Sequence, residues 1–192
     1  MKKLLSLAVA VLLMICLLPS TVKADEVTEY PLWVAGVQFT SANLTIDAGD
    51  STGIASGKAT YDPTSNTLTL DGLTYTGAGY QYIITWPGTT NEASNAAGIW
   101  YESEDALTVA LANKNTVTVT GYADYSYGFT ARTDNGVTIT GTGSLTAKGA
   151  DDCRLSYGMQ CWGPITVEKQ AELVGTAGDN SATQATASQT LI

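Results

Sequence analysis

The chain contains a repeat with a period of about 30 residues, which is within the range found for solenoid units. Gly98, Gly128 and Gly158 are evenly spaced, and each begins a segment in which short runs of alternating residues are separated by turn residues. Such a period is typical of solenoids, because one unit cannot bury its own apolar side chains whereas stacked units can. The repeat therefore predicts a solenoid that includes 98–121, 128–149 and 158–178.

Each unit supplies three short strands. Period-two alternation of β-branched residues between Gly, Asn and Asp predicts strands, and no amphipathic helical stretch longer than two turns follows Ala24. Three strands per unit fit one coil of a parallel β-helix, in which equivalent residues of successive coils stack about 4.8 Å apart. A looser unit at 61–77 brings the expectation to about four coils. A β-sandwich is the alternative, but it leaves the period unexplained.

The alternation also predicts which side chains face the core. An outward threonine column is expected at Thr108, Thr138 and Thr166, and the even spacing of Val117, Leu145 and Leu173 suggests that these three stack in the third strand. The inward positions are expected at Ile99, Tyr101, Phe129, Ala131, Met159 and Cys161 in the first strands, and at Leu107, Val109, Val137, Ile139, Ile165 and Val167 in the second.

Four segments are expected along the chain. Residues 1–24 combine a positive start with an apolar run of signal-peptide length and small residues before a cut after Ala24, so we expect a secreted protein, free or at the cell surface, with no membrane span after cleavage. Residues 25–60 are expected to form cap strands, because a bare β-helix end exposes its core and unpaired backbone. Residues 61–180 are expected to form the coils, and 181–192 are expected to be a flexible low-complexity tail.

Composition excludes several classes of function. The chain has no histidine, which excludes Ser-His-Asp and Cys-His catalysis and His-ligated metal sites. Asp and Glu number 18 against 9 Lys and Arg, and three of the nine basic residues lie in the predicted signal. The mature chain would therefore carry 6 basic against 18 acidic residues, a net charge of −12. Such a surface repels phosphate backbones, so nucleic acid is not expected as a partner.

The outward positions of the first strands predict a binding face. One column is Trp100, Thr130 and Gln160, and the next is Glu102, Arg132 and Trp162. If this register holds, Glu102 and Arg132 are expected at salt-bridge distance on adjacent coils, and Arg132 can also lie over Trp162. Exposed tryptophans suit polysaccharide recognition, because the C–H faces of sugar rings stack on aromatic planes. The alternative is that Trp100 and Trp162 are covered by the insertion at 77–97.

Two tyrosines add to the candidate ligand-binding set. Tyr122 and Tyr125 lie in a predicted loop and are ligand candidates, whereas Tyr127 and Tyr157 occupy equivalent places in the repeat and are expected to be structural. The ligand-binding residues predicted from the sequence are thus Trp100, Arg132, Trp162, Gln160, Glu102, Tyr122 and Tyr125.

Aspartates and cysteines give two further candidates. Asp124, Asp151 and Asp152 lie in what the repeat suggests are corresponding loops, where carboxylates could hold Ca²⁺; ordinary turn chemistry is the alternative. Cys153 and Cys161 could form a disulfide outside the cell, or remain free thiols.

Catalysis has weaker support in the residues. Glu102 and Glu104 would point the same way on a strand, about 7 Å apart, which is a separation that glycosidases use. Arg132 and Lys148 are available as the base of a polysaccharide lyase, but the groove on a solenoid of about four coils would be short. A non-catalytic protein is therefore expected.

The chain also resembles a known group of repeat proteins. The stretches 32–43 (LWVAGVQFTSAN) and 59–70 (ATYDPTSNTLTL) are similar to the opening of secreted repeat proteins of gut Firmicutes, as are the Tyr-Gly pairs at 127 and 157. Those proteins resemble the non-catalytic, right-handed parallel β-helix carbohydrate-binding domains of clostridia. The resemblance implies binding of polysaccharide, acidic plant polysaccharide in particular, and an association with calcium. The alternatives are a structural or adhesive surface module without a glycan ligand and, less favoured, a lyase-like enzyme.

Overall fold

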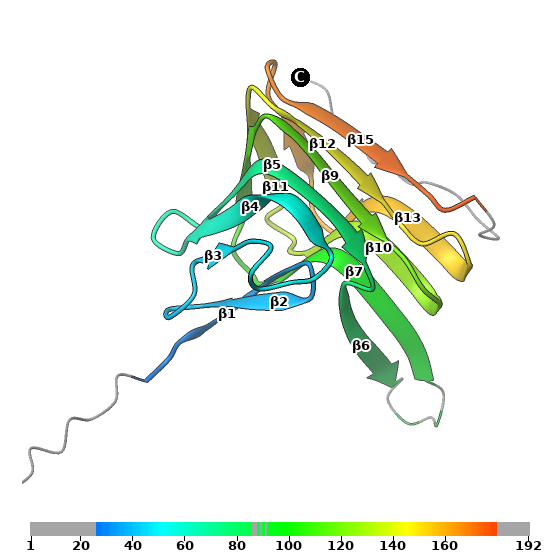
Figure 1. Cartoon of the computed structure of the whole chain (residues 1–192). Helices are drawn as coiled ribbons and strands as arrows, with labels where there is room; N and C mark the ends of the chain where they lie inside the picture. The colour runs from blue at the N-terminus through cyan, green and yellow to red at the C-terminus, as the bar shows by residue number, and fades with distance from the viewer. Residues whose placement is uncertain (1–25, 86–87, 89, 91, 180–192) are drawn as a thin grey trace, which may run out of the picture.

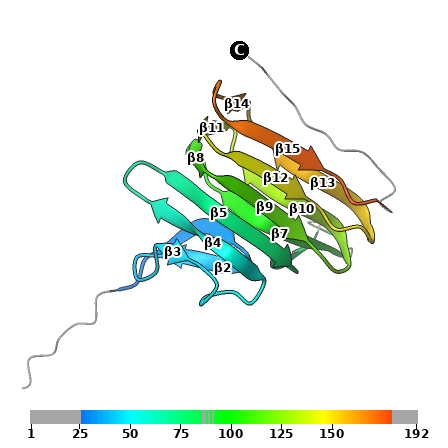
Figure 2. The same cartoon turned by 45° about the horizontal axis from the view of Figure 1, so that its top comes forward.

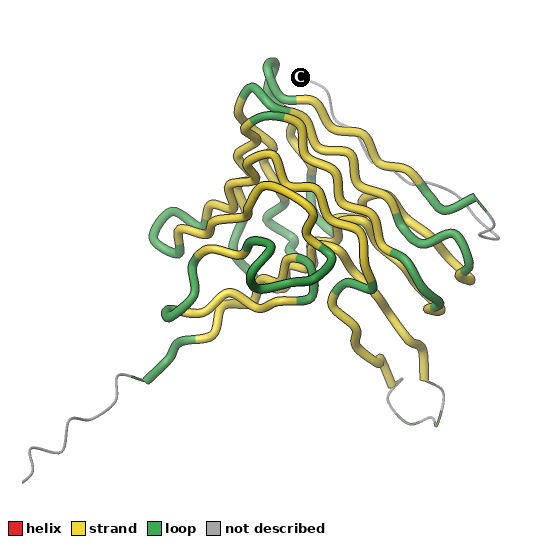
Figure 3. Tube along the Cα trace, viewed as in Figure 1, coloured by secondary structure: helices red, strands yellow, loops and turns green. Residues whose placement is uncertain are grey.

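The computed structural model describes residues 26–85, 88, 90 and 92–179, and within them the fold is all-β, with no helix (Figures 1 and 3). The predicted export signal and tail lie outside the described residues. The strands are β1 (Glu29–Val34), β2 (Val37–Thr40), β3 (Thr45–Ile46), β4 (Ile54–Asp62), β5 (Thr67–Gly77), β6 (Tyr80–Thr85), β7 (Glu92–Glu102), β8 (Leu107–Ala112), β9 (Lys114–Val119), β10 (Ala123–Arg132), β11 (Val137–Gly141), β12 (Ser144–Lys148), β13 (Cys153–Cys161), β14 (Ile165–Val167) and β15 (Glu172–Thr176).

Strands one repeat apart pair in parallel and form three ladders. The ladders are β7–β10–β13, β8–β11–β14 and β9–β12–β15. In the first ladder Phe129 pairs with both Ile99 and Met159, which confirms the predicted stacking. The predicted threonine column is also confirmed, since Thr138 pairs with Thr108 and Thr166. Parallel pairing across a whole period is not the arrangement of an antiparallel β-sandwich, and it is compatible with a parallel β-helix.

The predicted register of the third strands is wrong in one coil. Leu145 pairs with Leu173 as expected, but on the other side it pairs with Asn115, and Val117 pairs with Ala147. Equivalent residues of the first and second units are separated by the same number of residues throughout. Between the second and third units this separation becomes smaller after β13, because the turn after β13 is shorter than the turns after β7 and β10. The true alignment of this strand is hard to recognise in the sequence, because Asn115 is polar whereas the equivalent residues of the next two units are apolar.

Glycine recurs in the first strands because backbones meet there. A Cβ atom at Gly128 would lie 2.5 Å from the Lys148 nitrogen, and one at Gly158 would lie 1.9 Å from the Thr176 nitrogen. Both contacts join a strand of the first ladder to a strand of the third. The even glycine spacing is therefore the sequence signature of a corner at which two sides of each coil come into contact.

The N-terminal end of the ladders is closed by antiparallel strands. β5 runs parallel to β8 in its first half and parallel to β9 in its second half, and β4 pairs antiparallel with it. β1 pairs antiparallel with β2 and with β7. Figure 2 shows β2 to β4 at one end of the molecule and β13 to β15 at the other. One core runs between the ladders and includes the predicted inward residues, of which Cys161 and Val167 in the last coil are only partly buried.

Candidate functional site

Trp100 does not belong to an exposed face. Its side chain is only 2% exposed, and the Tyr82 ring lies 4.2 Å from it between centroids. Tyr82 belongs to β6, which pairs antiparallel with β7 and comes from the insertion at 77–97. The prediction of Trp100 as a ligand-binding residue is therefore wrong, and the alternative of a covering segment holds for this tryptophan.

Trp162, in contrast, is open to solvent. It follows β13, its side chain is 61% exposed, and its backbone nitrogen donates to the Ala131 carbonyl at 3.1 Å. The guanidinium carbon of Arg132 lies over the Trp162 ring, 5.3 Å from its centroid. Arg132 also lies 3.9 Å from the Glu102 carboxylate. Both contacts predicted for Arg132 from the repeat register are thus confirmed.

Arg132 is held between aromatic rings. Besides Trp162, its guanidinium carbon lies 4.4 Å from the centroid of Trp100 and 5.4 Å from that of Tyr82. Its Nη2 donates to the Tyr82 hydroxyl at 3.2 Å. Burial raises the pKa of Tyr82 well above its usual value, and the nearby Arg132 charge offsets only part of this rise. Tyr82 is therefore a neutral acceptor at physiological pH, and it fixes the guanidinium in one orientation.

A cleft of about 480 Å³ opens beside Trp162 and Arg132, and we call it the Trp–Arg cleft. Asn135 and Thr133 anchor one wall by donating to the backbone carbonyls of Glu104 and Asp105 at 2.6 and 2.9 Å. Three carboxylates and one guanidinium line the cleft, so its walls carry a net charge of −2. The lining residues are Glu102, Ser103, Glu104, Arg132, Thr133, Asp134, Asn135 and Trp162.

Gln160 lies close to this site on the same outer face. It pairs in the ladder with Thr130, and its side chain is partly exposed. The Thr130 hydroxyl is fully buried and has no hydrogen-bond partner among the described residues. An unpaired buried hydroxyl is uncommon in folded proteins.

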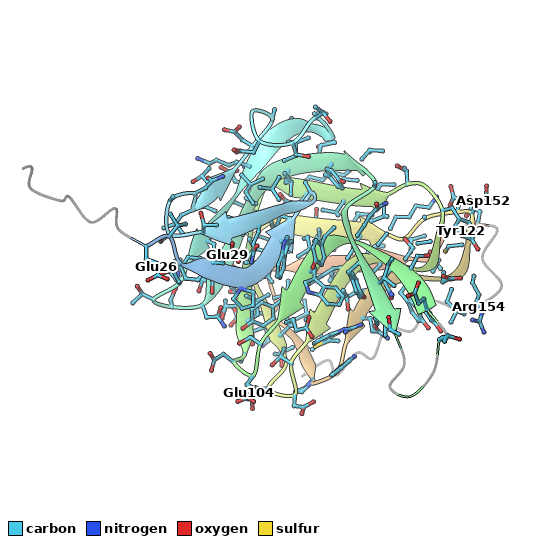
Figure 4. All side chains as sticks on the ribbon, turned by 90° about the horizontal axis from the view of Figure 1, so that it is seen from below. Glu26, Glu29, Glu104, Tyr122, Asp152 and Arg154 are labelled. Carbon is cyan, nitrogen blue, oxygen red and sulfur yellow. The ribbon has the colours of Figure 1, made fainter. Side chains whose placement is uncertain are left out.

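The other two aromatic candidates, Tyr122 and Tyr125, lie in different parts of the structure. Tyr122 is 74% exposed and lines a second cleft, of about 710 Å³, together with Asp151, Asp152 and Arg154. Figure 4 shows Tyr122, Asp152 and Arg154 on one side of the molecule and Glu104 on another. Tyr125 is not in a loop with Tyr122: it lies on β10 and packs, partly buried, against the aromatic cluster around Trp100.

The proposed calcium corner is not assembled. Asp124 lies on β10, and its carboxylate accepts from the Ser94 nitrogen and hydroxyl at 2.8 and 2.9 Å, which lowers its pKa. Asp151 pairs with Lys148 at 2.8 Å, and this hydrogen bond likewise lowers the pKa of Asp151. Within the described part of the chain no three His, Cys, Asp or Glu side chains group to hold a metal ion, so the set Asp124, Asp151 and Asp152 is not a ligand set here.

The candidate disulfide is not formed. Cys153 and Cys161 are free thiols at the two ends of β13. Eight residue steps along a strand separate them by roughly 26 Å, whereas a disulfide needs Cα atoms about 4.4–6.8 Å apart. Burial raises the pKa of both thiols and so disfavours the reactive thiolate form.

Two pairs of stacked aromatic rings are further features of the outer face. Tyr80 stacks on Trp33 with ring centroids 4.6 Å apart, so that the cap and β6 together cover Trp100. Tyr127 and Tyr157 stack at 5.3 Å with an interplanar angle of 10°. The second feature had a signal in the sequence, because the two tyrosines precede equivalent glycines of the repeat. The first had none, since β1 and β6 stand outside the repeat.

Comparison of the chain with family models, curated proteins and solved structures found no match. The described residues contain no helix with the length and apolar character to cross a membrane. The resemblance noted from the sequence therefore stays a prediction.

Proposed function

We propose that the protein is an exported, non-catalytic polysaccharide-binding protein built on a short right-handed parallel β-helix of about four coils. The observation that carries the proposal is the Trp–Arg cleft, in which Trp162 is 61% exposed beside an immobilised guanidinium. A tryptophan ring combines a large flat apolar face with a polar N–H group, which is why tryptophan is enriched at binding surfaces. In this cleft the Trp162 ring lies next to polar groups that can form hydrogen bonds with sugar hydroxyls.

The immobilisation of Arg132 favours binding. Its side chain is only 17% exposed and is fixed by rings and by the Tyr82 hydroxyl. A preorganised group loses little further conformational entropy when a ligand arrives, so more of the interaction energy appears as affinity. Trp162 has one ring face beside Arg132, and the stacking of a sugar ring on its exposed surface needs no rearrangement of the fold.

The charges of the cleft favour a neutral polysaccharide. Glu102, Glu104 and Asp134 outweigh the one guanidinium of Arg132. An acidic polymer, which the family resemblance implies, would be repelled unless a cation such as Ca²⁺ bridged the two. We therefore expect neutral polysaccharides to bind without calcium, and acidic ones to need it.

Affinity electrophoresis on neutral and acidic polysaccharides, each with and without calcium, tests the proposal. Trp162→Ala should weaken binding at least about tenfold, which corresponds to the loss of one aromatic contact. Tyr122→Ala is the matched control, since Tyr122 is also a largely exposed aromatic and lies in a different cleft. If no polysaccharide binds, or if Trp162→Ala binds like the wild type, the proposal is wrong.

The same samples separate the alternatives. Uniformly negative binding would favour a structural or adhesive surface module. Release of unsaturated uronates from pectin would show a lyase-like enzyme, with the acids and Arg132 of the Trp–Arg cleft as its site. Export is tested by the N-terminal sequence of secreted protein, which should begin at Asp25.

A further inference from the structure

The rings of Tyr157, on β13, and of Trp162, directly after β13, share an orientation relative to β10. Tyr157 stacks on Tyr127, its neighbour on β10, with nearly parallel planes. Because Tyr127 covers one face of the Tyr157 ring, the other face is turned away from β10. Arg132, also on β10, lies over the Trp162 ring, so the second face of this ring is likewise turned away from β10.

Both second faces are therefore turned toward the side of β13 that is away from β10. Among the described residues β13 pairs with β10 alone, and its other edge carries no strand. Trp162 is exposed and Tyr157 is partly exposed at this edge. An unpaired strand edge also presents backbone N–H and C=O groups, which are donors and acceptors for hydroxyl groups.

The spacing of the two rings suits an extended ligand. Tyr157 packs against the aromatic cluster of Trp100, and Arg132 lies over both Trp100 and Trp162, so both rings lie on the same face although Trp162 follows the end of β13. Five steps of extended chain separate the two residues and span at most roughly 16 Å. Gln160 lies between them with a partly exposed amide, which offers both a donor and an acceptor. A single sugar ring cannot contact both aromatic residues, whereas an oligosaccharide of several rings can.

We infer that a linear, extended, neutral polysaccharide binds along the outer edge of β13, with one sugar ring on Trp162, another on Tyr157, and the Gln160 amide between them. This inference rests on the proposed function and adds its ligand class: the internal part of an extended chain, rather than a monosaccharide or a chain end. The glycan takes the place that a further strand would occupy in the first ladder.

The test measures affinity for a neutral linear β-glucan from the disaccharide to the hexasaccharide by titration calorimetry. The affinity should rise at least about tenfold over this series. Tyr157→Leu, which keeps an apolar side chain against Tyr127, should remove the rise with length and leave disaccharide binding unchanged. Trp162→Ala should weaken binding at every length, and Tyr122→Ala should change neither. Unfolding midpoints of all variants show whether the fold is kept.

The outcomes separate this inference from the proposed function. Binding that depends on Trp162 but not on ligand length, or a length dependence that survives in folded Tyr157→Leu, overturns the inference and leaves the function standing. The absence of binding at any length overturns both. A dimer of the protein that the hexasaccharide does not dissociate overturns the inference, because the edge of a second copy would then occupy the same place.

Discussion

Arg132 lies at the centre of the aromatic contacts on the outer face of the first ladder. Its guanidinium contacts the rings of Trp100, Tyr82 and Trp162 and donates to the Tyr82 hydroxyl, whereas its carboxylate partner Glu102 is half exposed and 3.9 Å away. A pair this exposed contributes little, about 0–1 kcal/mol. The ring contacts matter more, because cation–π interactions strengthen when the cation is removed from water.

Replacement of Arg132 by Ala should therefore lower the free energy of unfolding by about 1–3 kcal/mol, and Arg132→Lys should give a smaller loss, because an ammonium keeps the charge but not the planar contact. Urea unfolding measures both. Arg154→Ala is the control: this arginine is exposed, and its loss should cost less than about 0.5 kcal/mol. Equal losses at the two positions would contradict the assigned packing.

The different exposure of Trp100 and Trp162 shows what the sequence could and could not predict about the site. Register places Arg132 beside Glu102 and Trp162, and the repeat alone is sufficient to predict it. The burial of Trp100 depends on β6 and β1, which pair antiparallel with β7 and have no counterpart in the repeat. Non-repeating segments carry no periodic signal, so the choice between an exposed and a covered Trp100 could not be made without the structure.

The corners between strands are closed by small or hydrogen-bonding residues. Gly128 allows β10 to approach β12, since a Cβ atom there would lie within 2.7 Å of three backbone atoms. Ser126 and Ser156 accept from the backbone nitrogens of Ala150 and Gly178 at 2.8 and 2.7 Å. The glycine spacing was readable from the sequence. The equally spaced serines give no comparable signal, because serine is ordinary at turns and at exposed positions and does not by itself mark a corner.

Gly128→Ala should lower the free energy of unfolding by about 2–4 kcal/mol, because the backbone atoms around the new methyl group cannot move without separating two strands. Gly175→Ala is a matched control, since the nearest atom to its Cβ would be 3.2 Å away and the cost should stay below about 1 kcal/mol. Thermal or urea unfolding of the two variants gives the comparison. A Gly128→Ala protein as stable as Gly175→Ala would argue against the close corner.

Asn115 ties three strands together at another corner. Its carbonyl oxygen accepts from the Leu73 nitrogen at 2.8 Å, and its amide donates to the carbonyls of Ala112 and Ser144 at 3.1 Å each. The side chain is fully buried. Its neighbours in the column, Leu145 and Leu173, are apolar, so the first coil uses a hydrogen-bonding residue where the later coils use leucine.

Asn115→Leu would make this column uniform and should nevertheless lower the free energy of unfolding by about 2–3 kcal/mol. The leucine leaves the buried Leu73 N–H without its acceptor, and an unsatisfied buried group costs about 1–3 kcal/mol. Hydrogen exchange should show weaker protection at Leu73. A variant as stable as the wild type would mean that packing in the column outweighs these hydrogen bonds.

The two ends of the molecule differ in a way that bears on function. Antiparallel strands close the N-terminal end, whereas in the last coil Cys161, Val167 and Leu173 are only partly buried and Val174 is 42% exposed. Partial burial weakens the packing of a coil, so among the described coils this one is expected to be the least stable. The proposed glycan-binding edge lies on this coil, and bound polysaccharide should therefore stabilise the protein.

Buried tyrosines throughout the molecule set its stability at high pH. Burial raises the pKa of Tyr61 and of Tyr127 to about 12 and also raises that of Tyr75. An unfolded tyrosine ionises near pH 10, so below that pH both states hold the phenol proton and the full stability is present. Above it the unfolded chain loses protons first, and stability falls until the folded pKa is reached.

We therefore expect the free energy of unfolding to fall between about pH 10 and pH 12, by at most about 1.4 kcal/mol per pH unit for each such tyrosine. Urea unfolding from about pH 9 to about pH 11.5 measures the slope. Tyr127→Phe keeps the ring stacked on Tyr157 and removes one ionisable group, so its curve should be shallower than that of the wild type. If the slope is unchanged in Tyr127→Phe, the Tyr127 hydroxyl ionises as freely in the folded protein as in the unfolded chain, and the tight aromatic face around it is not present in solution.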